Sequence, residues 1–397
     1  MKRQFVLLLS ACIAISMFVF GCGSGGEQIK IGMAGPLTGE QGKAGQDVLH
    51  GVQLAVSEWN AKGGVLGKRV VIIAGDDRGE EKEAYEIATR LSDQGVAGVI
   101  GHYNSHCSIA GSRIYSQRMI PQISPSSTNP TFTENGFANV FRTCGRDDQQ
   151  GRIAADFAVN TLKARRIAVF HDGTTYGKGL AEEFKKAILS LQLPADEAGA
   201  KTKGSPQRVA IVAEAVIPLI NEGKIPDYGG LLDPLISLQP DMIYFGGNYP
   251  EGAVLVRQVK ERKLAAVFMA GDAIANSVFI KMGGIAAEGI FYTFGPAVED
   301  MPQAGRFYGA FKARYGELGP YSIYSYDAAN VLLESIVKAG VTSGDSLVKV
   351  LHSSKFSGAL GDIEFDAKGD IKISPYVIWT VKGAEFIPYK SPQTDAQ

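Results

Sequence analysis

The sequence predicts an α/β protein with two parallel sheets, each covered by helices on both faces. Short continuous apolar segments, such as 70–73 and 166–170, have the length and composition of strands buried on both faces. Amphipathic segments such as 80–94 follow them, with apolar residues at helical spacing. This alternation starts near residue 29 and restarts after residue 143, which favours two α/β units in tandem.

The expected elements alternate along most of the chain. Strands are expected at 29–33, 70–73, 96–100, 166–170, 209–216, 242–245 and 266–269. Helices are expected near 48–59, 80–94, 149–162, 177–191, 303–315, 321–339 and 346–351. Residues 201–207 read as a loop, 219–226 as an extra connection, and 361–370 as a hairpin with Gly369 in its turn.

Length and composition agree with a large exported protein. The chain has 397 residues, of which 45% are hydrophobic, so it can bury two domain cores. Its formal net charge is −1, and after the extreme N-terminus the basic residues are spread along the chain. This distribution gives no sign of a nucleic-acid-binding surface.

The N-terminus has the features of an export signal. Lys2 and Arg3 precede an apolar run at 5–20, which is too short for a confident membrane span and ends at Gly21-Cys22. We therefore expect a lipoprotein-type signal peptide over 1–22, with Cys22 as the lipidated N-terminus of the mature protein. A plain secretory signal cut nearby is the alternative. Residues 23–28 form a flexible tether, and no later segment is long and apolar enough to cross a bilayer.

Two cysteines, Cys107 and Cys144, remain in the mature chain. In an exported protein such a pair can form a disulfide. Sequence alone does not place their Cα atoms within bonding range, so a disulfide and two buried thiols both remain open.

Two polar junctions suggest a site for a small anion. The first follows the strand at 96–100, where Ser105 is expected as the N-cap of the next helix. The free N–H groups and the positive dipole end of that helix would favour a carboxylate. The second junction, at 121–129, carries Ser126 and Thr128. The alternative is that both are ordinary capped turns between strands and helices.

Known catalytic and metal-binding motifs are missing. No phosphate-binding Gly-rich motif follows a strand in the mature chain, and there is no Gly-x-Ser-x-Gly nucleophile motif. His171 and Asp172 are adjacent but have no nucleophile nearby, which disfavours catalysis. A change from strand to helix between His102 and His106 spoils the spacing of a metal site with Cys107.

The remaining polar residues suit a zwitterion. Ser105 and Thr128 can donate hydrogen bonds to a carboxylate, and the Ser126 carbonyl can accept one from an ammonium group. Asp272 can neutralise that ammonium, while Tyr176 can supply a wall or a hydroxyl group. A pocket with both signs rejects compounds that lack either charge, because a buried charge without a partner costs several kcal/mol. Alternatively, Asp272 caps a helix and Tyr176 is a packing residue.

Several short motifs occur in an order that resembles the leucine/isoleucine/valine-binding proteins, the substrate-binding subunits of ATP-binding-cassette importers. They are NAKGG at 60–64, DD at 76–77, VIGH at 99–102, SPSST at 124–128, FRT at 141–143, HD at 171–172, YG at 176–177, GG at 246–247 and DAKGD at 366–370. Each motif is weak alone, but their joint order is specific and spans nearly all of the mature chain.

This resemblance implies a type I periplasmic binding protein fold. Two doubly wound parallel-sheet lobes joined by three crossovers would then close on a ligand. Lobe 1 would comprise 29–146 plus 296–372, and lobe 2 would comprise 147–295 plus 373–390. No cofactor and no metal are expected, and the protein would be a monomer.

The resemblance also assigns residues to the site. Ser105, Ser126 and Thr128 would bind the ligand's carboxylate and ammonium groups from lobe 1. Lobe 2 would contribute Tyr176 and Asp272, where the family often has Glu. The pocket for the ligand's side chain would be lined by Ala44, Tyr103, Asn104, Asn248 and Tyr321, with Tyr249 beside them. In place of the family's usual cysteine pair, this chain has Arg78-Gly79 and Asn104.

We therefore expect a lipid-anchored solute-binding protein in the periplasm or on the outer face of the cell membrane. It would capture an α-amino acid by lobe closure and deliver it to the permease of an importer. Amides and phenols in the pocket would be left unpaired against leucine, which favours a polar or aromatic side chain on the ligand. A ligand-sensing receptor domain coupled to a membrane signalling partner is the main alternative, and an exported hydrolase is a weaker one.

Overall fold

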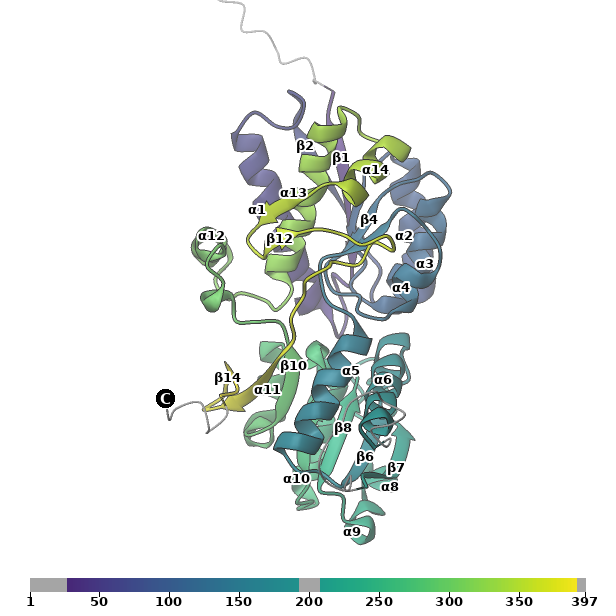
Figure 1. Cartoon of the computed structure of the whole chain (residues 1–397), viewed down its shortest axis with the longest axis vertical. Coiled ribbons are helices and arrows are strands. Elements are labelled where there is room, and N and C mark those ends of the chain that lie inside the picture. The colour runs from purple at the N-terminus through teal and green to yellow at the C-terminus, as the bar shows by residue number, and fades with distance from the viewer. Residues whose placement is uncertain (1–26, 193–207, 391–397) are drawn as a thin grey trace, which may run out of the picture.

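The computed structural model describes residues 27–192 and 208–390, which form two α/β lobes (Figure 1). The expected signal peptide, Cys22, most of the tether and the loop at 201–207 lie outside the described residues. Each lobe has one central sheet with helices packed on it. The two-lobed α/β architecture predicted from the sequence is therefore present.

The first lobe is built on a five-stranded parallel sheet of order β2-β1-β3-β4-β5. Its strands are β1 (Ile29–Gly35), β2 (Val70–Asp76), β3 (Val99–Gly101), β4 (Gln122–Ser124) and β5 (Val140–Arg142). Its helices are α1 (Gly42–Ala61), α2 (Glu81–Asp93), α3 (Ser105–Ser116), α4 (Thr131–Glu134), α12 (Gly305–Tyr315), α13 (Ser322–Ala339) and α14 (Asp345–Ser353). The α1 and α13 helices pack together, as do α2 and α3.

Successive residues of a strand in this sheet face opposite layers. Met33 and Ile100 pack with the α1 and α13 side, whereas Ala34 and Val99 pack with the α2 and α3 side. This alternation is the period of two expected for a strand covered on both faces. It explains why the strands are continuously apolar in the sequence.

The second lobe is built on a seven-stranded sheet of order β14-β13-β10-β9-β8-β6-β7. The strands are β6 (Arg166–His171), β7 (Ala210–Val216), β8 (Met242–Gly246), β9 (Val267–Ala270), β10 (Phe291–Phe294), β13 (Val377–Lys382) and β14 (Glu385–Pro388). Five strands are parallel, and β13 and β14 extend the sheet in antiparallel fashion. Helices in this lobe include α5 (Asp147–Asp156), α6 (Thr175–Gln192), α8 (Gly229–Leu232), α9 (Leu235–Leu238), α10 (Tyr249–Glu261) and α11 (Ser277–Gly283).

The chain passes between the two sheets three times. It crosses from β5 to α5, from β10 to α12, and from the end of lobe 1 to β13. Figure 1 shows α5 beginning where the two lobes meet, with the yellow C-terminal segment crossing beside it. The loops at the carboxyl ends of strands in both sheets therefore face one junction.

Several local predictions differ from the structure. The strand expected at 96–100 is shorter and shifted, because β3 begins only at Val99. The helix expected at 149–162 begins at Asp147, and from Phe157 to Thr161 it continues as a π-helix. The strand expected at 209–216 is present as β7, whereas 219–226 forms no helix or strand beyond one isolated bridge.

The hairpin expected at 361–370 is only partly present. The β12 strand (Gly361–Ile363) pairs with the preceding β11 strand (Phe356–Gly358) and not with the segment after it. One isolated bridge, Phe365 to Ile371, closes the turn that contains Gly369. Gly369 has a φ of +94°, which a residue with a side chain rarely adopts.

The two cysteines of the mature chain are not bonded to each other. Cys107 lies in α3 and Cys144 follows β5, and both are free and buried. The Cys144 thiol faces the Ser127 carbonyl oxygen at 3.6 Å. Of the two readings that the sequence left open, the disulfide is therefore wrong. Among the described residues, no helix combines the length and the hydropathy that a membrane span requires.

Candidate functional site

A small cavity at the junction of the lobes gathers most of the predicted site residues. It has an empty volume of about 260 Å³ and is lined by Tyr103, Asn104, Ser105, Ser126, Tyr176, Asn248, Asp272, Ala273 and Tyr321. These residues come from loops after β3, β4, β6, β8 and β9 and from the segment before α13. Sequence reasoning missed Ala273, while the predicted Ala44, Thr128 and Tyr249 are not among the lining residues.

The wall from the first lobe consists of hydroxyl groups and the first turn of α3. Ser105 is the first residue of this helix and Asn104 is its N-cap, so the prediction of Ser105 as N-cap is wrong by one residue. The Ser126 hydroxyl donates to the Tyr103 carbonyl oxygen at 2.9 Å. This bond joins the loop after β4 to the loop after β3. The first N–H groups of α3 have no acceptor within the helix, which leaves them available to an anion.

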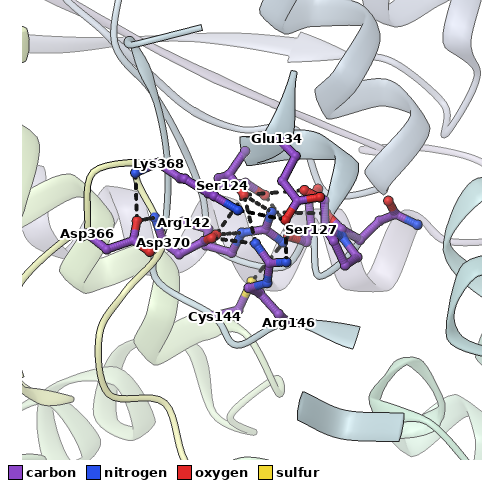
Figure 2. A network of polar contacts seen from close by, with 12 residues as sticks. Ser124, Ser127, Glu134, Arg142, Cys144, Arg146, Asp366, Lys368 and Asp370 are labelled. Atoms are coloured by element: carbon purple, nitrogen blue, oxygen red, sulfur yellow. Dashed lines mark hydrogen bonds and ion pairs between the residues drawn. The ribbon is translucent and has the colours of Figure 1, made fainter. Parts of the chain in front are cut away.

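Arg142 holds the loop after β4 from behind (Figure 2). Its guanidinium group donates to the carbonyl oxygens of Ser127 and Asn129 at 2.6 and 3.0 Å. The same group pairs with Asp370 at 2.7 Å, and the Arg142 side chain is fully buried. Arg146 also binds Asp370, at 2.6 Å. The sequence marked Arg142 and Asp370 only as parts of motifs, and their pairing emerges from the fold.

The wall from the second lobe is centred on a buried carboxylate. Asp272 accepts hydrogen bonds from the hydroxyl groups of Tyr176, at 2.7 Å, and Tyr321. Burial raises the pKa of Asp272, and these phenol donors act against that rise. No cationic side chain in the described ranges forms an ion pair with it. Asp272 begins a short 3₁₀ helix whose N-cap is Gly271, so it is not the capping residue.

Tyr176 combines the two roles that the sequence left open. Its ring is part of the apolar core of the second lobe, beside Leu180 and Met269. Its hydroxyl group lines the cavity and bonds Asp272. Tyr176 therefore packs the lobe and also orients the buried carboxylate.

Two amides form the remaining polar part of the cavity wall. The Asn248 side chain donates to Asp172 at 2.9 Å, so it is fixed within the second lobe. Asn104 donates to Gln41 at 2.8 Å, while its buried Oδ1 atom has no hydrogen-bond partner. A Cβ atom at Gly79 would lie 3.3 Å from this Oδ1 atom. The two positions where the resemblance placed a cysteine pair are thus neighbours here without a covalent link.

The histidines after β3 belong to the packing of lobe 1. His102 is fully buried and lies between Asp77, at 2.6 Å, and the Tyr115 hydroxyl, at 3.1 Å. His106 contacts the Gly79 carbonyl oxygen at 2.7 Å. Over 27–192 and 208–390, no group of three or more His, Cys, Asp or Glu side chains could hold a metal ion.

A larger cavity, with an empty volume of about 800 Å³, lies elsewhere. Its lining includes Tyr292, Phe294 and Trp379, together with Lys43 and Asp47. Lys43 and Asp47 already pair with each other at 2.6 Å. We take the smaller cavity as the candidate site because hydroxyl groups and a buried carboxylate converge there from both lobes.

Known proteins share both this sequence and this fold. The family model described as periplasmic binding protein matches residues 28–385. A Leu/Ile/Val-binding protein homolog from Brucella abortus is 34% identical over 380 residues, which are 95% of this chain and 97% of that protein. The chain belongs to the leucine/isoleucine/valine-binding protein family of periplasmic binding proteins.

Solved and characterised members support the same placement. The crystal structure of a leucine binding protein from Thermotoga maritima superposes with a TM-score of 0.79 at 30% identity, over 92% of this chain and 99% of that one. A leucine-, isoleucine-, valine-, threonine- and alanine-binding protein from Pseudomonas aeruginosa is 32% identical, over 94% of both chains. The predicted type I periplasmic binding protein fold is thus confirmed, and these relatives are named as binding proteins and not as enzymes.

Proposed function

We propose that this protein is an extracytoplasmic solute-binding protein that captures a small α-amino acid and delivers it to an ABC importer. The observation that supports this most is the cavity itself. Hydroxyl groups and a helix N-terminus line one side, and the buried Asp272 carboxylate lines the other. A ligand with a carboxylate at one end and an ammonium group at the other matches both sides.

Each predicted residue has a role in this proposal. The Ser105 hydroxyl and the N–H groups of the first turn of α3 bind the ligand's carboxylate. The Ser126 carbonyl and the Thr128 hydroxyl complete the contacts from lobe 1. Asp272, oriented by Tyr176 and Tyr321, neutralises the ammonium group.

Binding is coupled to lobe closure in this proposal. Lobe 1 comprises 29–146 plus 296–372, and lobe 2 comprises 147–295 plus 373–390. Because both lobes contribute contacts to one ligand, the ligand favours the closed state. The permease of the importer would recognise that closed state, and a ligand-sensing receptor would use the same movement.

The side chain of the ligand is proposed to be polar or aromatic. Tyr103, Asn104 and Tyr321 line this part of the cavity, and the Asn104 Oδ1 atom is buried without a partner. A hydroxyl or N–H group on the ligand would satisfy that acceptor, whereas leucine would leave it unpaired at a cost of about 1–3 kcal/mol. The relative from Pseudomonas aeruginosa, whose name includes threonine, shows that a family member takes a hydroxylated ligand.

Export and anchoring complete the proposal. Residues 1–22 would be removed as a lipoprotein signal peptide, and Cys22 would carry the lipid. Residues 23–28 would tether a monomeric binding protein to the membrane surface. Labelling of the expressed protein with a radioactive fatty acid, and its loss in Cys22→Ala, would test this part.

A thermal-shift screen of the mature protein against the twenty amino acids tests the function. A ligand that binds only the native state stabilises it by RT ln(1 + [L]/Kd), about 2.7 kcal/mol at a hundredfold excess over Kd. We expect the largest shifts with amino acids that carry a hydroxyl, amide or aromatic side chain. Absence of any shift across the screen would contradict the proposed function.

A further inference from the structure

A second acidic residue lies buried next to Asp272 without a partner. Both carboxylate oxygens of Asp147 are buried and accept no hydrogen bond. The Thr128 hydroxyl and both polar atoms of the Gln150 side chain are likewise buried and unpaired. Buried polar groups are normally satisfied, so a cluster of unpaired ones indicates a bound polar group.

The fold places this cluster against the cavity. Asp147 is the first residue of α5, and its N–H group donates to the Thr128 carbonyl oxygen at 3.0 Å. Gln150 lies one turn further along α5. A Cβ atom at Gly271 would lie 2.6 Å from the Tyr176 hydroxyl and 2.9 Å from Gln150 Oε1. The cluster therefore adjoins the residue pair, Tyr176 and Asp272, that forms the cavity wall.

The charges around Asp147 do not balance it. Its ionised form is opposed by burial first and by the Asp272 carboxylate next, and together they raise the pKa of Asp147 well above its ordinary value. The opposing influences are the Thr128 hydroxyl and the Arg142 guanidinium group. Arg142 is already engaged by Asp370 and by two carbonyl groups.

Other titratable groups near Asp147 add no cation. They are Asp148 on α5, Cys144 in the crossover before it, Tyr176 on α6, Tyr244 on β8 and Tyr376 in the crossover before β13. Two buried carboxyl groups thus face each other with only neutral groups and a committed arginine around them. Such a pair retains a proton until a cation arrives.

We propose that Asp147, with Thr128 and Gln150, forms a second anionic contact for the ammonium group of the ligand, and that ligand binding releases a proton from the Asp147 and Asp272 pair. This inference rests on the proposed function and names its charge-recognising residues further. The ammonium group takes the electrostatic place of the shared proton, which leaves to solvent as the two carboxylates become fully ionised. Amino acids should bind, whereas N-acetyl amino acids and α-hydroxy acids should not.

Titration calorimetry of the full mature protein with the best amino acid from the screen tests this. At pH 6.5, titrations in two buffers of different ionisation enthalpy report the number of protons released. We expect release of between a half and one proton, and an affinity that rises up to tenfold per pH unit from pH 5.5 to 7.5. A wild-type protein that binds its ligand with no proton exchange overturns the inference and leaves the proposed function intact.

Two variants locate the proton. Asp147→Asn keeps the shape of the side chain and is expected to abolish proton release and weaken binding at least tenfold at pH 7.5. Asp148→Asn alters the neighbouring carboxylate, which is more exposed and pairs with Arg146, and should leave both quantities unchanged. Proton release that persists in Asp147→Asn would also overturn the inference. Failure of the wild-type protein to bind any amino acid would instead contradict the proposed function.

Discussion

The two walls of the cavity differ in how far their polar groups are satisfied without a ligand. In the first lobe, the Ser126 hydroxyl is bonded, and the buried Arg142 is paired with Asp370. In the second lobe, Asp272 has only neutral donors, and Asp147 has no hydrogen-bond partner. The first wall is therefore organised in advance for an anion, whereas the second lacks a cation. A ligand's ammonium group would complete the second wall, which explains why binding would favour closure.

The largest effect is expected from breaking the support of the first wall. Arg142→Met leaves Asp370 and the carbonyl groups of Ser127 and Asn129 without their buried partner. Loss of one member of a buried ion pair destabilises a protein by about 3–5 kcal/mol. We expect a fall of this size in the free energy of unfolding, measured by chemical denaturation without ligand.

Arg118→Met provides the matched control for this change. Arg118 pairs with Asp93 at 2.6 Å, but both side chains are more than half exposed. Exposed pairs contribute about 0–1 kcal/mol, so this variant should unfold almost like the wild type. Equal losses in the two variants would show that the first wall does not depend on its buried arginine.

The second wall is tested by removing its charge. Asp272→Asn keeps the volume of the side chain but leaves the ligand's ammonium group without its carboxylate. Such a loss costs about 3 kcal/mol or more, which is at least a hundredfold in affinity by calorimetry. The free protein should not lose stability, because the variant no longer buries an unpaired charge. Unchanged affinity would remove the second wall from the site.

The general fold could be predicted because its signals are local. Alternating apolar strands and amphipathic helices fix two parallel sheets, and the carboxyl ends of their strands define the site. Tyr103, Ser105 and Asn248 were found in this way, since each follows a strand directly. Tyr176 and Tyr321 were identified by family resemblance, and the structure shows that they share one carboxylate.

Other features depend on contacts between distant segments. The Arg142 to Asp370 pair spans 228 positions of the chain, and nothing local marks either residue as buried. Asp147 looked like an ordinary acidic residue in the first turn of a helix, because sequence does not show that Asp272 lies next to it. The disulfide expectation failed for the same reason, since two cysteines in one chain carry no information about their separation.

A pH-dependent effect is expected from another buried acid of the second lobe. Burial raises the pKa of Glu251 to about 7, although the Ile220 N–H group donates to it at 3.1 Å. A raised folded-state pKa means that stability is lost as the pH rises from about 4.5 through 7. Glu251→Gln removes this loss and should be more stable than the wild type at pH 8, by about 2–3 kcal/mol.

Thermal and chemical unfolding at two pH values would check this result. At pH 4.5 the wild-type carboxyl group is largely protonated when folded, so the two proteins should be nearly equal in stability. A gain that is the same at both pH values would mean that packing and not ionisation explains the effect of Glu251→Gln. It would then remove Glu251 from the group of costly acids in the second lobe.

The smallest effect is expected from a single hydroxyl group of the organised first wall. Ser105→Ala removes one donor to the ligand's carboxylate but leaves the N–H groups of α3 in place, because a backbone donor does not depend on the side chain. A single hydrogen bond of this kind is worth about 1.5 kcal/mol, or roughly tenfold in affinity. Ser116→Ala, at the far end of the same helix, removes a hydroxyl bonded only to the Arg113 carbonyl and should not affect binding. If Ser105→Ala weakened binding as much as Asp272→Asn, the ligand's carboxylate would depend on one side chain, and the contrast between an organised wall and an incomplete wall would fail.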